Sequence, residues 1–360
     1  MNRSRRHFLR QAALAPLAGC AVQPAAATLD ARVCRVPPRG SRVPCYPTIA
    51  AAVAAAPALA GRPFRIGIAA GRWDEALVID KPGIHLIGAG REHCRIGADR
   101  AAGQRRADGE PWGTWGCASV IVRAADFHAR QLTFENRFDY LGHLRRPVLE
   151  TVGANGAQAV ALMFDTGADR VLLEDCDIDG HQDTLFAEAG RSWLRRCRVR
   201  GSVDFIFGAG TCVLDDCLLL SRHRPGKERQ GYVLAPSTRA DQPVGLLARR
   251  CRLQREPAVA DASVALGRPW RPTRSFADGR YGDPAVRGFG LFVDCWMDAH
   301  IDPAGWDAMA YSRRDGQRVL FEPGEARLGE AGSHGPGARA GRGWSPAAAA
   351  VVEFRRYRPF

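Results

Sequence analysis

A short residue pattern recurs five times between residues 171 and 299, each time around a cysteine. Each copy has a pair of apolar residues, two mostly polar residues, the cysteine and a further alternation, which is typical of a short β-strand. Cys176, Cys197 and Cys217 are almost evenly spaced, and the longer intervals before Cys251 and Cys295 indicate inserted loops. The copies are VLLEDCDIDG (171–180), SWLRRCRVRG (192–201), CVLDDCLLLS (212–221), LLARRCRLQ (246–254) and LFVDCWMDA (291–299).

A period of about 20 residues with one strand pattern per repeat is the signature of a solenoid. Helical repeats do not fit, because the units are too short and too rich in β-branched residues and turns. Leucine-rich repeats would require a leucine and asparagine ladder, which the sequence lacks. We therefore expect an all-β fold, a parallel β-helix in which residues one coil apart stack at roughly 4.8 Å. Asp183 and Asp204, which are separated by one such period, would then be neighbours on adjacent coils.

The cysteines permit two interpretations in this fold. Cys197 and Cys217 would stack beside the two aspartates, where they could form a disulfide or simply fill an interior ladder as small apolar side chains. Both interpretations remain open at this point. Cys34 and Cys45 are close in sequence and could clip the N-terminal segment together.

Residues 1–27 have the composition of a signal peptide, with a charged start, a modest apolar run and then small residues. SRRHFL (4–9) resembles a twin-arginine export motif, and LAGC (17–20) resembles a lipobox, which would make Cys20 a lipidation site. The alternative is an ordinary signal cleaved near 25–27, with Cys20 discarded. We expect a bacterial exported protein, either an outer-membrane lipoprotein facing the periplasm or the cell surface, or a secreted protein.

The remaining chain divides into a long repeat region and a short tail. TIAAAVAAAP (48–57) has high helix propensity, and Thr48 could be the N-cap of a helix that covers the open end of the solenoid. We expect residues 28–345 to form the β-helix domain, which closes with a glycine-rich stretch at 331–345. Residues 346–360 are expected to be a C-terminal tail with a short helix.

The chain is strongly basic, with a formal net charge of +13 that comes almost entirely from arginine. Such a charge either attracts a polyanion or reflects an arginine-rich solvated surface. We find no zinc-ligand spacing and no basic region with heptads, so a known nucleic-acid module is not indicated. An acidic polysaccharide would also fit this charge.

The two aspartates lie in GHQDTLF (180–186) and VDFIFG (203–208), and adjacent carboxylates can divide the work of a reaction. One acts as the nucleophile, and the other, whose charge is disfavoured by its neighbour, acts as an acid and then as a base. An arginine could hold the first carboxylate, and Arg268 in LGRPW (266–270) is suited to this because its planar cation binds a carboxylate in two places.

These stretches, with AQAVAL (157–162) and YVLAPST (232–238), resemble the motifs of the bacterial pectin methylesterase (pectinesterase) family in their order and spacing. GTWG (113–116), TFEN (133–136), DGRYGDP (278–284) and GWDAM (305–309) extend the resemblance over nearly the whole mature chain. The resemblance implies a right-handed parallel β-helix and a carboxylic ester hydrolase. Its substrate would be methyl-esterified homogalacturonan (pectin), from which it releases methanol.

The resemblance also implies site roles. Asp204 would be the nucleophile, Asp183 the general acid and base, Gln158 and Gln182 the oxyanion donors, and Arg268 the residue that orients Asp204. No metal or cofactor is implied, nucleic acid is not expected as a partner, and a monomer is expected. The implied substrate-binding residues are Thr114, Phe186, Val203, Phe207, Arg224, Tyr232, Trp270, Thr273 and Met309.

Three alternatives remain at this level. A β-helix esterase or thioesterase could act on another acyl substrate, although the presence of Asp183 favours the pectin enzyme. A polygalacturonase-like hydrolase also uses aspartates, but its chemistry does not call for two glutamines and an arginine beside the nucleophile. A non-catalytic polysaccharide-binding surface protein would tolerate the loss of Asp204.

Overall fold

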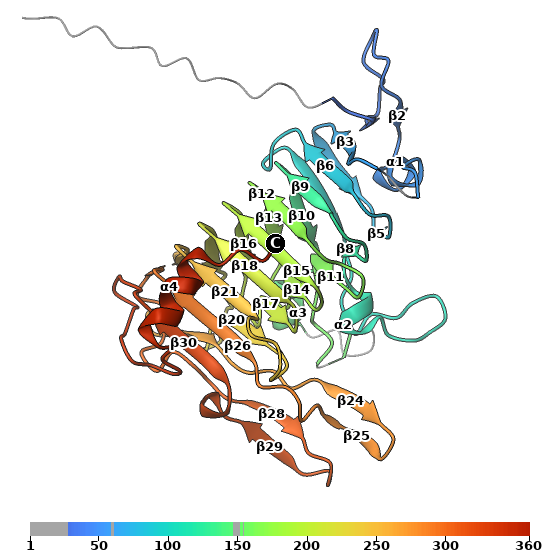
Figure 1. The fold of residues 1–360 in the computed structure, drawn as a ribbon. Helices are drawn as coiled ribbons and strands as arrows, with labels where there is room; N and C mark the ends of the chain where they lie inside the picture. The colour runs from blue at the N-terminus through green and yellow to red at the C-terminus, as the bar shows by residue number, and fades with distance from the viewer. Residues whose placement is uncertain (1–27, 59–60, 147–151, 154) are drawn as a thin grey trace, which may run out of the picture.

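The structure is a computed structural model that describes residues 28–58, 61–146, 152–153 and 155–360. Its body is a parallel β-helix, in which the chain winds through three stacked sheets, as Figure 1 shows from blue to red. The predicted all-β solenoid is thus confirmed. The predictions of a signal peptide at 1–27, a twin-arginine motif and lipidation at Cys20 all lie outside the described residues.

The first sheet, which we call sheet A, has 11 strands. In spatial order they are β2 (Cys45–Tyr46), β1 (Ala31–Val33), β3 (Phe64–Ile68), β6 (Ile84–Gly88), β9 (His128–Arg130), β12 (Val171–Glu174), β15 (Arg191–Arg195), β18 (Thr211–Asp215), β21 (Leu246–Arg249), β26 (Phe289–Val293) and β30 (Arg327–Ala331).

Sheet B has eight strands and sheet C has seven. Sheet B contains β27 (Trp296–Met297), β22 (Arg252–Arg255), β19 (Leu218–Ser221), β16 (Arg198–Gly201), β13 (Asp177–Asp179), β10 (Thr133–Asn136), β7 (Cys94–Ala98) and β4 (Gly71–Asp74). Sheet C contains β23 (Val264–Gly267), β20 (Gly231–Pro236), β17 (Ile206–Gly208), β14 (Leu185–Ala187), β11 (Leu162–Phe164), β8 (Val120–Val122) and β5 (Leu77–Ile79).

The repeated pattern contains a bend that alternation alone does not reveal. The residue just before each repeat cysteine has a positive φ of 52–55°, and this residue turns the chain from sheet A into sheet B. Asp is among the residue types that tolerate this left-handed conformation best, and three of the five positions carry it. The five residues are Asp175, Arg196, Asp216, Arg250 and Asp294.

The cysteines that follow these bends form an interior ladder of free thiols. Cys176, Cys197, Cys217, Cys251 and Cys295 are all at most 2% exposed. The Sγ atoms of Cys197 and Cys217 contact the carbonyl oxygens of Leu173 and Leu194 on the preceding coil. The disulfide considered between Cys197 and Cys217 is absent, and both cysteines are free, buried thiols. By contrast, Cys34 and Cys45 are joined as a disulfide, as predicted.

Helices cover the N-terminal end and one side of the β-helix. The predicted capping helix is α1 (Ile49–Ala54), and the Thr48 hydroxyl accepts a hydrogen bond from the Ala51 N–H at 3.1 Å. The predicted C-terminal helix is α4 (Ala348–Arg356), which packs through Phe354 and Val351 on apolar side chains of sheet A. Arg249 ties the tail down by donating hydrogen bonds to three of its carbonyl groups.

Two hairpins and three short helices depart from the coils. One hairpin consists of β24 (Thr273–Phe276) and β25 (Gly279–Gly282), and the other of β28 (Met309–Ser312) and β29 (Arg318–Phe321). Figure 1 shows both hairpins projecting from the coiled body. The short helices are α2 (Gly113–Gly116), α3 (Tyr140–Arg145) and the 3-10 helix η1 (Pro323–Glu325). No helix in the described ranges is long and apolar enough to cross a membrane.

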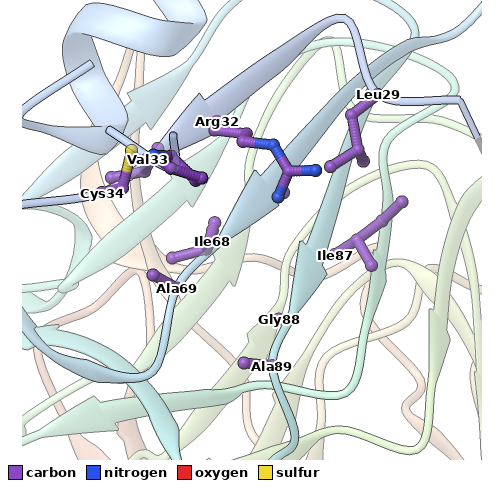
Figure 2. A pocket seen from close by; sticks show the side chains of 11 residues that line it. Leu29, Arg32, Val33, Cys34, Ile68, Ala69, Ile87, Gly88 and Ala89 are labelled. Atoms are coloured by element: carbon purple, nitrogen blue, oxygen red, sulfur yellow. The ribbon is translucent and has the colours of Figure 1, made fainter. Parts of the chain in front are cut away.

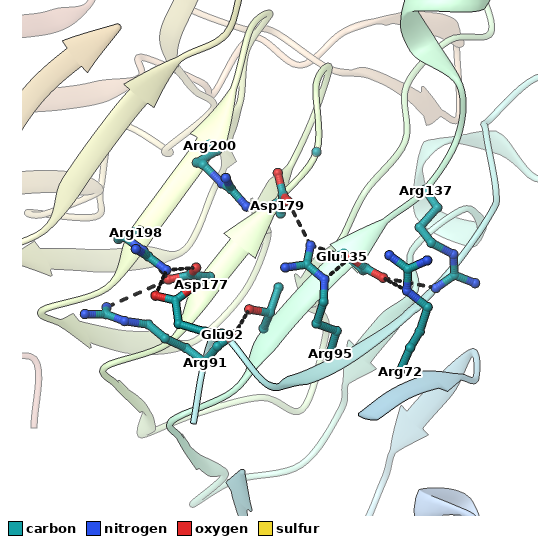
Figure 3. A network of polar contacts seen from close by, with 12 residues as sticks. Arg72, Arg91, Glu92, Arg95, Glu135, Arg137, Asp177, Asp179, Arg198 and Arg200 are labelled. Carbon is teal, nitrogen blue, oxygen red and sulfur yellow. Dashed lines mark hydrogen bonds and ion pairs between the residues drawn. The ribbon is translucent and has the colours of Figure 1, made fainter. Parts of the chain in front are cut away.

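Six arginines pair with carboxylates on the outer face of sheet B, where the two kinds of side chain stack across the strands (Figure 3). Arg95 contacts Glu135 at 2.5 Å and Asp179 at 3.0 Å, so one guanidinium links two successive strands. These six arginines therefore have a structural use. The network comprises Arg72, Arg91, Glu92, Arg95, Glu135, Arg137, Asp177, Asp179, Arg198 and Arg200.

Candidate active site

Asp183 and Asp204 occupy equivalent places on successive coils of sheet C. Leu185 in β14 pairs with Ile206 in β17, and each aspartate lies two residues before its paired residue. The backbone N–H of Asp183 donates to the carbonyl of Val203 at 3.0 Å, which joins the two turns directly. Both aspartates have a positive φ, 63° and 49°, a conformation that recurs at strained functional positions. The coil period therefore brings the two carboxylates together, as predicted.

Arg268 reaches Asp204 from the end of β23. Its Nε and one terminal nitrogen donate to the two carboxylate oxygens of Asp204 at 2.9 and 2.7 Å. Its guanidinium also lies over the ring of Tyr232, 3.9 Å from the centroid. Just before Arg268, Gly267 lets β23 pack closely against β20, because a Cβ there would lie 2.3 Å from the carbonyl oxygen of Leu234. A two-point contact of this kind fixes both the position and the orientation of a carboxylate.

Asp183 has a different environment from Asp204. Its side chain is buried, and this desolvation raises the pKa of its carboxyl well above the usual 3.8. The negative charge of Asp204 raises the pKa further, and Arg268 opposes the shift. A carboxyl group whose pKa is raised by burial therefore lies beside a second carboxylate that an arginine holds. This is the arrangement needed to separate an acid from a nucleophile.

These groups open onto a cavity of about 480 Å³. Gln158 and Gln182 lie on its wall, and their segments are joined because the Ala159 N–H donates to the carbonyl of Gln182 at 3.1 Å. All five residues expected to carry the chemistry thus meet in one cavity. Its lining consists of Thr114, Asn155, Gln158, Gln182, Asp183, Asp204, Phe207, Ala235, Arg268, Trp270, Ala308, Met309, Ala310 and Arg318.

The cavity has an aromatic wall that differs in part from the prediction. Phe207 and Trp270 line it, but Phe186 is fully buried and stacks on Phe207 with centroids 4.1 Å apart. The expectation that Phe186 offers a face to a sugar is therefore wrong, because neighbouring rings cover it. Trp115 packs against Phe186 and Trp270 and remains 37% exposed. It was not singled out from the sequence, although the GTWG stretch contains it.

Only some of the other residues expected to bind substrate line the cavity. Thr114 and Met309 line the cavity, whereas Val203 is buried, and Tyr232 lies beneath Arg268.

Two further expected residues lie outside the cavity lining. Thr273 is exposed in β24. The guanidinium of Arg224 donates to the carbonyl of Arg229 within its own loop, at 3.1 Å. Conversely, sequence reasoning missed Asn155 and Arg318, because no motif contains them.

A smaller cavity of about 260 Å³ lies beside β1, β3 and β6 (Figure 2). Its wall is mainly apolar, with Leu29, Ile68 and Ile87 around the single charged side chain of Arg32. It has no carboxylate and no amide side chain in its lining. It therefore lacks the means for the acid and base chemistry that the larger cavity provides.

The structure thus combines a parallel β-helix with a cavity that holds paired carboxylates, one of them bound by arginine. Residues 39–339 match the family model Pectinesterase. Pectinesterase A from Dickeya dadantii is 39% identical over 297 residues, which cover 81% of this chain and 80% of that protein. The chain therefore belongs to the pectinesterase family and is a carboxylic ester hydrolase of the pectin methylesterase type.

Solved structures agree with this assignment. A crystal structure of pectin methylesterase in complex with a hexasaccharide has a TM-score of 0.86 at 36% identity, and covers 93% of this chain and 99% of that one. Pectin methylesterase from Yersinia enterocolitica has a TM-score of 0.82 at 38% identity, with 86% and 96% covered.

Proposed function

We propose that the protein hydrolyses the C6 methyl esters of polygalacturonate, with Asp204 as the nucleophile and Asp183 as the general acid and base. The observation that carries the proposal is the two-point contact of Arg268 with Asp204 beside the buried Asp183, whose raised pKa favours the protonated acid. Membership of the pectinesterase family supports the ester substrate, and the relative solved with a hexasaccharide supports a sugar chain in the cavity.

In the first step, a carboxylate oxygen of Asp204 attacks the ester carbonyl carbon. The carbonyl π electrons move to its oxygen, and the side-chain amides of Gln158 and Gln182 stabilise this oxyanion by donating hydrogen bonds. When the oxyanion collapses, the bond to the methoxy oxygen breaks, and Asp183 gives its proton to this oxygen. Methanol leaves, and an anhydride now joins Asp204 to the sugar carboxyl carbon.

In the second step, Asp183 is a carboxylate and takes a proton from a water molecule. The resulting hydroxide attacks the sugar carboxyl carbon, and the bond to Asp204 breaks. Asp204 regains its negative charge, Asp183 regains its proton, and the sugar leaves as a free carboxylic acid that ionises in water. The raised pKa of Asp183 supports this cycle, because the group must begin each turnover protonated.

The test is methanol release from highly methyl-esterified polygalacturonate. Asp204→Asn should reduce the rate by at least about 10³-fold, because the amide is a poor nucleophile. Asp175→Asn is a matched control, since Asp175 also has a positive φ (52°) and an arginine partner but lies in an exposed bend. A folded Asp204→Asn variant with wild-type activity would remove Asp204 as the nucleophile.

We also propose that residues 1–27 direct export and that Cys20 is lipidated. The support is the arrangement of a charged start, an apolar run and LAGC at 17–20. In cells that express the full chain, Cys20→Ala should move the protein from the membrane fraction to the soluble exported fraction. Unchanged fractionation would favour simple secretion.

A further inference from the structure

We propose that the loop closed by the Cys34–Cys45 disulfide is a docking surface for an anionic phospholipid bilayer. This loop, which we call the basic loop, spans residues 34–45 and has the sequence CRVPPRGSRVPC. Its arginines bind lipid phosphates, and Val36 enters the bilayer interface between them. The inference gives the N-terminal end of the β-helix a function of its own, which depends on neither the reaction nor the lipidation of Cys20.

The basic loop is held at both ends, so its cationic side chains extend from a fixed base. In the parallel pair of β1 and β2, Arg32 lies opposite Cys45. The disulfide joins the same two segments again where the loop begins and ends. Pro37, Pro38 and Pro44 restrict the backbone between the two cysteines. A loop that is restricted in this way loses less conformational entropy when it binds a partner.

The basic loop presents positive charge that no carboxylate balances. Arg35, Arg39 and Arg42 are exposed, and none of them forms an ion pair in the part of the chain that the structure describes. Arg35 donates to the backbone carbonyl of Arg72 at 3.4 Å, which leaves its charge uncompensated. The sequence from 31 to 73 contains no aspartate or glutamate. By contrast, Arg62 and Arg72 pair with carboxylates that lie outside this stretch.

The apolar part of the basic loop favours a bilayer over a soluble polyanion. Val36 is 78% exposed and lies between Arg35 and Arg39 in the sequence. An exposed apolar side chain among cations fits the bilayer interface, where phosphates lie next to acyl chains. An acidic polysaccharide offers carboxylates but no acyl layer for such a side chain. Residues 35–44 also contain no aromatic ring on which a sugar ring would pack.

The small cavity beside β1, β3 and β6 adds apolar surface next to the basic loop. Pro38 of the loop forms part of its wall, together with Leu29 and Ile87. Figure 2 shows the side chain of Arg32 extending toward Leu29 along this wall. The lining contains no carboxylate, so Arg32 has no acidic partner within it. A cation in an apolar wall suits a molecule that combines a negative headgroup with an acyl chain.

The basic loop lies away from the candidate active site. Figure 1 shows β2 at one end of the stacked sheets and the β28–β29 hairpin, which contributes to the large cavity, toward the other end. The first strand, β1, begins at Ala31, so the segment at 1–27 leads into the β-helix beside the basic loop. A bilayer bound at this end leaves the large cavity open to a polymer.

The experiment measures binding to vesicles of phosphatidylcholine alone and to vesicles of phosphatidylcholine mixed with phosphatidylglycerol. All proteins carry Cys20→Ala and are collected after export, so no acyl chain contributes. The parent protein should bind the mixed vesicles and should bind phosphatidylcholine alone much more weakly. The variant Arg35→Gln/Arg39→Gln/Arg42→Gln should bind the mixed vesicles at least about tenfold more weakly, because three cations near an anionic surface are lost.

Two further variants separate the basic loop from net charge. Arg280→Gln/Arg287→Gln/Arg356→Gln is the matched control, since it removes the same charge from exposed arginines that also lack ion pairs in the described ranges. This control should bind the mixed vesicles almost as the parent does. Val36→Ser should weaken binding about threefold without any change in charge. All variants should keep the Tm of the parent and its rate of methanol release from a soluble pectin.

Three outcomes would overturn the proposal. The first is that the parent does not bind the mixed vesicles, and the second is that the matched control loses as much binding as the loop variant. The third concerns the other polyanion, unesterified polygalacturonate, which the loop variant should bind as the parent does. If the loop variant lost this binding and Val36→Ser changed vesicle binding in no way, the basic loop would be a polysaccharide site and not a bilayer site.

Discussion

Arg268 and Asp204 are joined by two hydrogen bonds of 2.9 and 2.7 Å across 64 residues of chain. The contact orients the carboxylate, and the ring of Tyr232 supports the guanidinium from its other side at 3.9 Å. The position of the proposed nucleophile therefore depends on a planar cation and cannot be reproduced by charge alone.

Arg268→Lys should accordingly reduce kcat by about 10²-fold while the protein stays folded, because an ammonium group cannot bind both oxygens or stack on Tyr232 in the same way. Steady-state methanol release measures the rate, and circular dichroism checks the fold. Arg196→Lys is the matched control, since Arg196 binds Asp175 through two nitrogens in an exposed bend. If both variants had wild-type activity, Arg268 would have only a structural role.

Asp183 should make the protein less stable as the pH rises. Burial raises the pKa of its carboxyl well above 3.8, so the folded protein keeps a proton that the unfolded chain releases. Stability must then fall as the pH increases from about 4 towards the raised pKa. In Asp183→Asn this contribution disappears, so its Tm should fall less than that of wild type between about pH 4 and pH 8. Parallel Tm profiles for the two proteins would contradict the raised pKa.

The free cysteines should react only slowly with thiol reagents in the folded protein. The eight free thiols among the described residues are all buried, so a reagent in solution cannot reach them while the protein is folded. A thiol reagent should label them slowly in the native state of the processed chain and label all eight after unfolding without reductant. If only six were labelled, one further disulfide would exist, and Cys197 with Cys217 would be the first pair to examine.

Trp115 should contribute to binding of the sugar chain more than to the reaction. It is the exposed member of an aromatic cluster that includes Trp270 on the cavity wall. Trp115→Ala should raise KM for the polymer about three- to tenfold with little change in kcat, because an aromatic platform is lost away from the reacting bond. Trp115→Phe should restore much of the affinity. A fall in kcat alone would show that Trp115 acts by positioning the reaction centre.

The repeat period predicted that residues one coil apart in the site would be neighbours. Asp183 and Asp204 are one period apart, so their proximity followed from stacking alone. Arg268 was proposed from the chemistry of a guanidinium in LGRPW and from the resemblance to a family, since no periodicity relates it to Asp204. The N-cap at Thr48 and the disulfide between Cys34 and Cys45 could also be predicted from the sequence, because each joins residues that are close in sequence.

What could not be predicted depends on packing between distant segments. Phe186 lies in a motif but is covered by Phe207 and Trp115, and a sequence does not show which face of a ring is covered. Arg318 is carried by a hairpin outside the repeats, so neither period nor motif connects it to the cavity. The choice between a disulfide and a thiol ladder depended on how the cysteines pack against backbone of the preceding coil.

A hairpin that projects from the coils is a place where the sequence of such an enzyme can be varied. The paired aspartates belong to the coils. Arg318 and Met309 belong to the β28–β29 hairpin, which is inserted between coils without changing the register of their strands. Exchanges in 309–321 can therefore alter which sugar chains are bound while the paired aspartates stay in place. A library confined to this segment would sample new polymer preferences on unchanged coils.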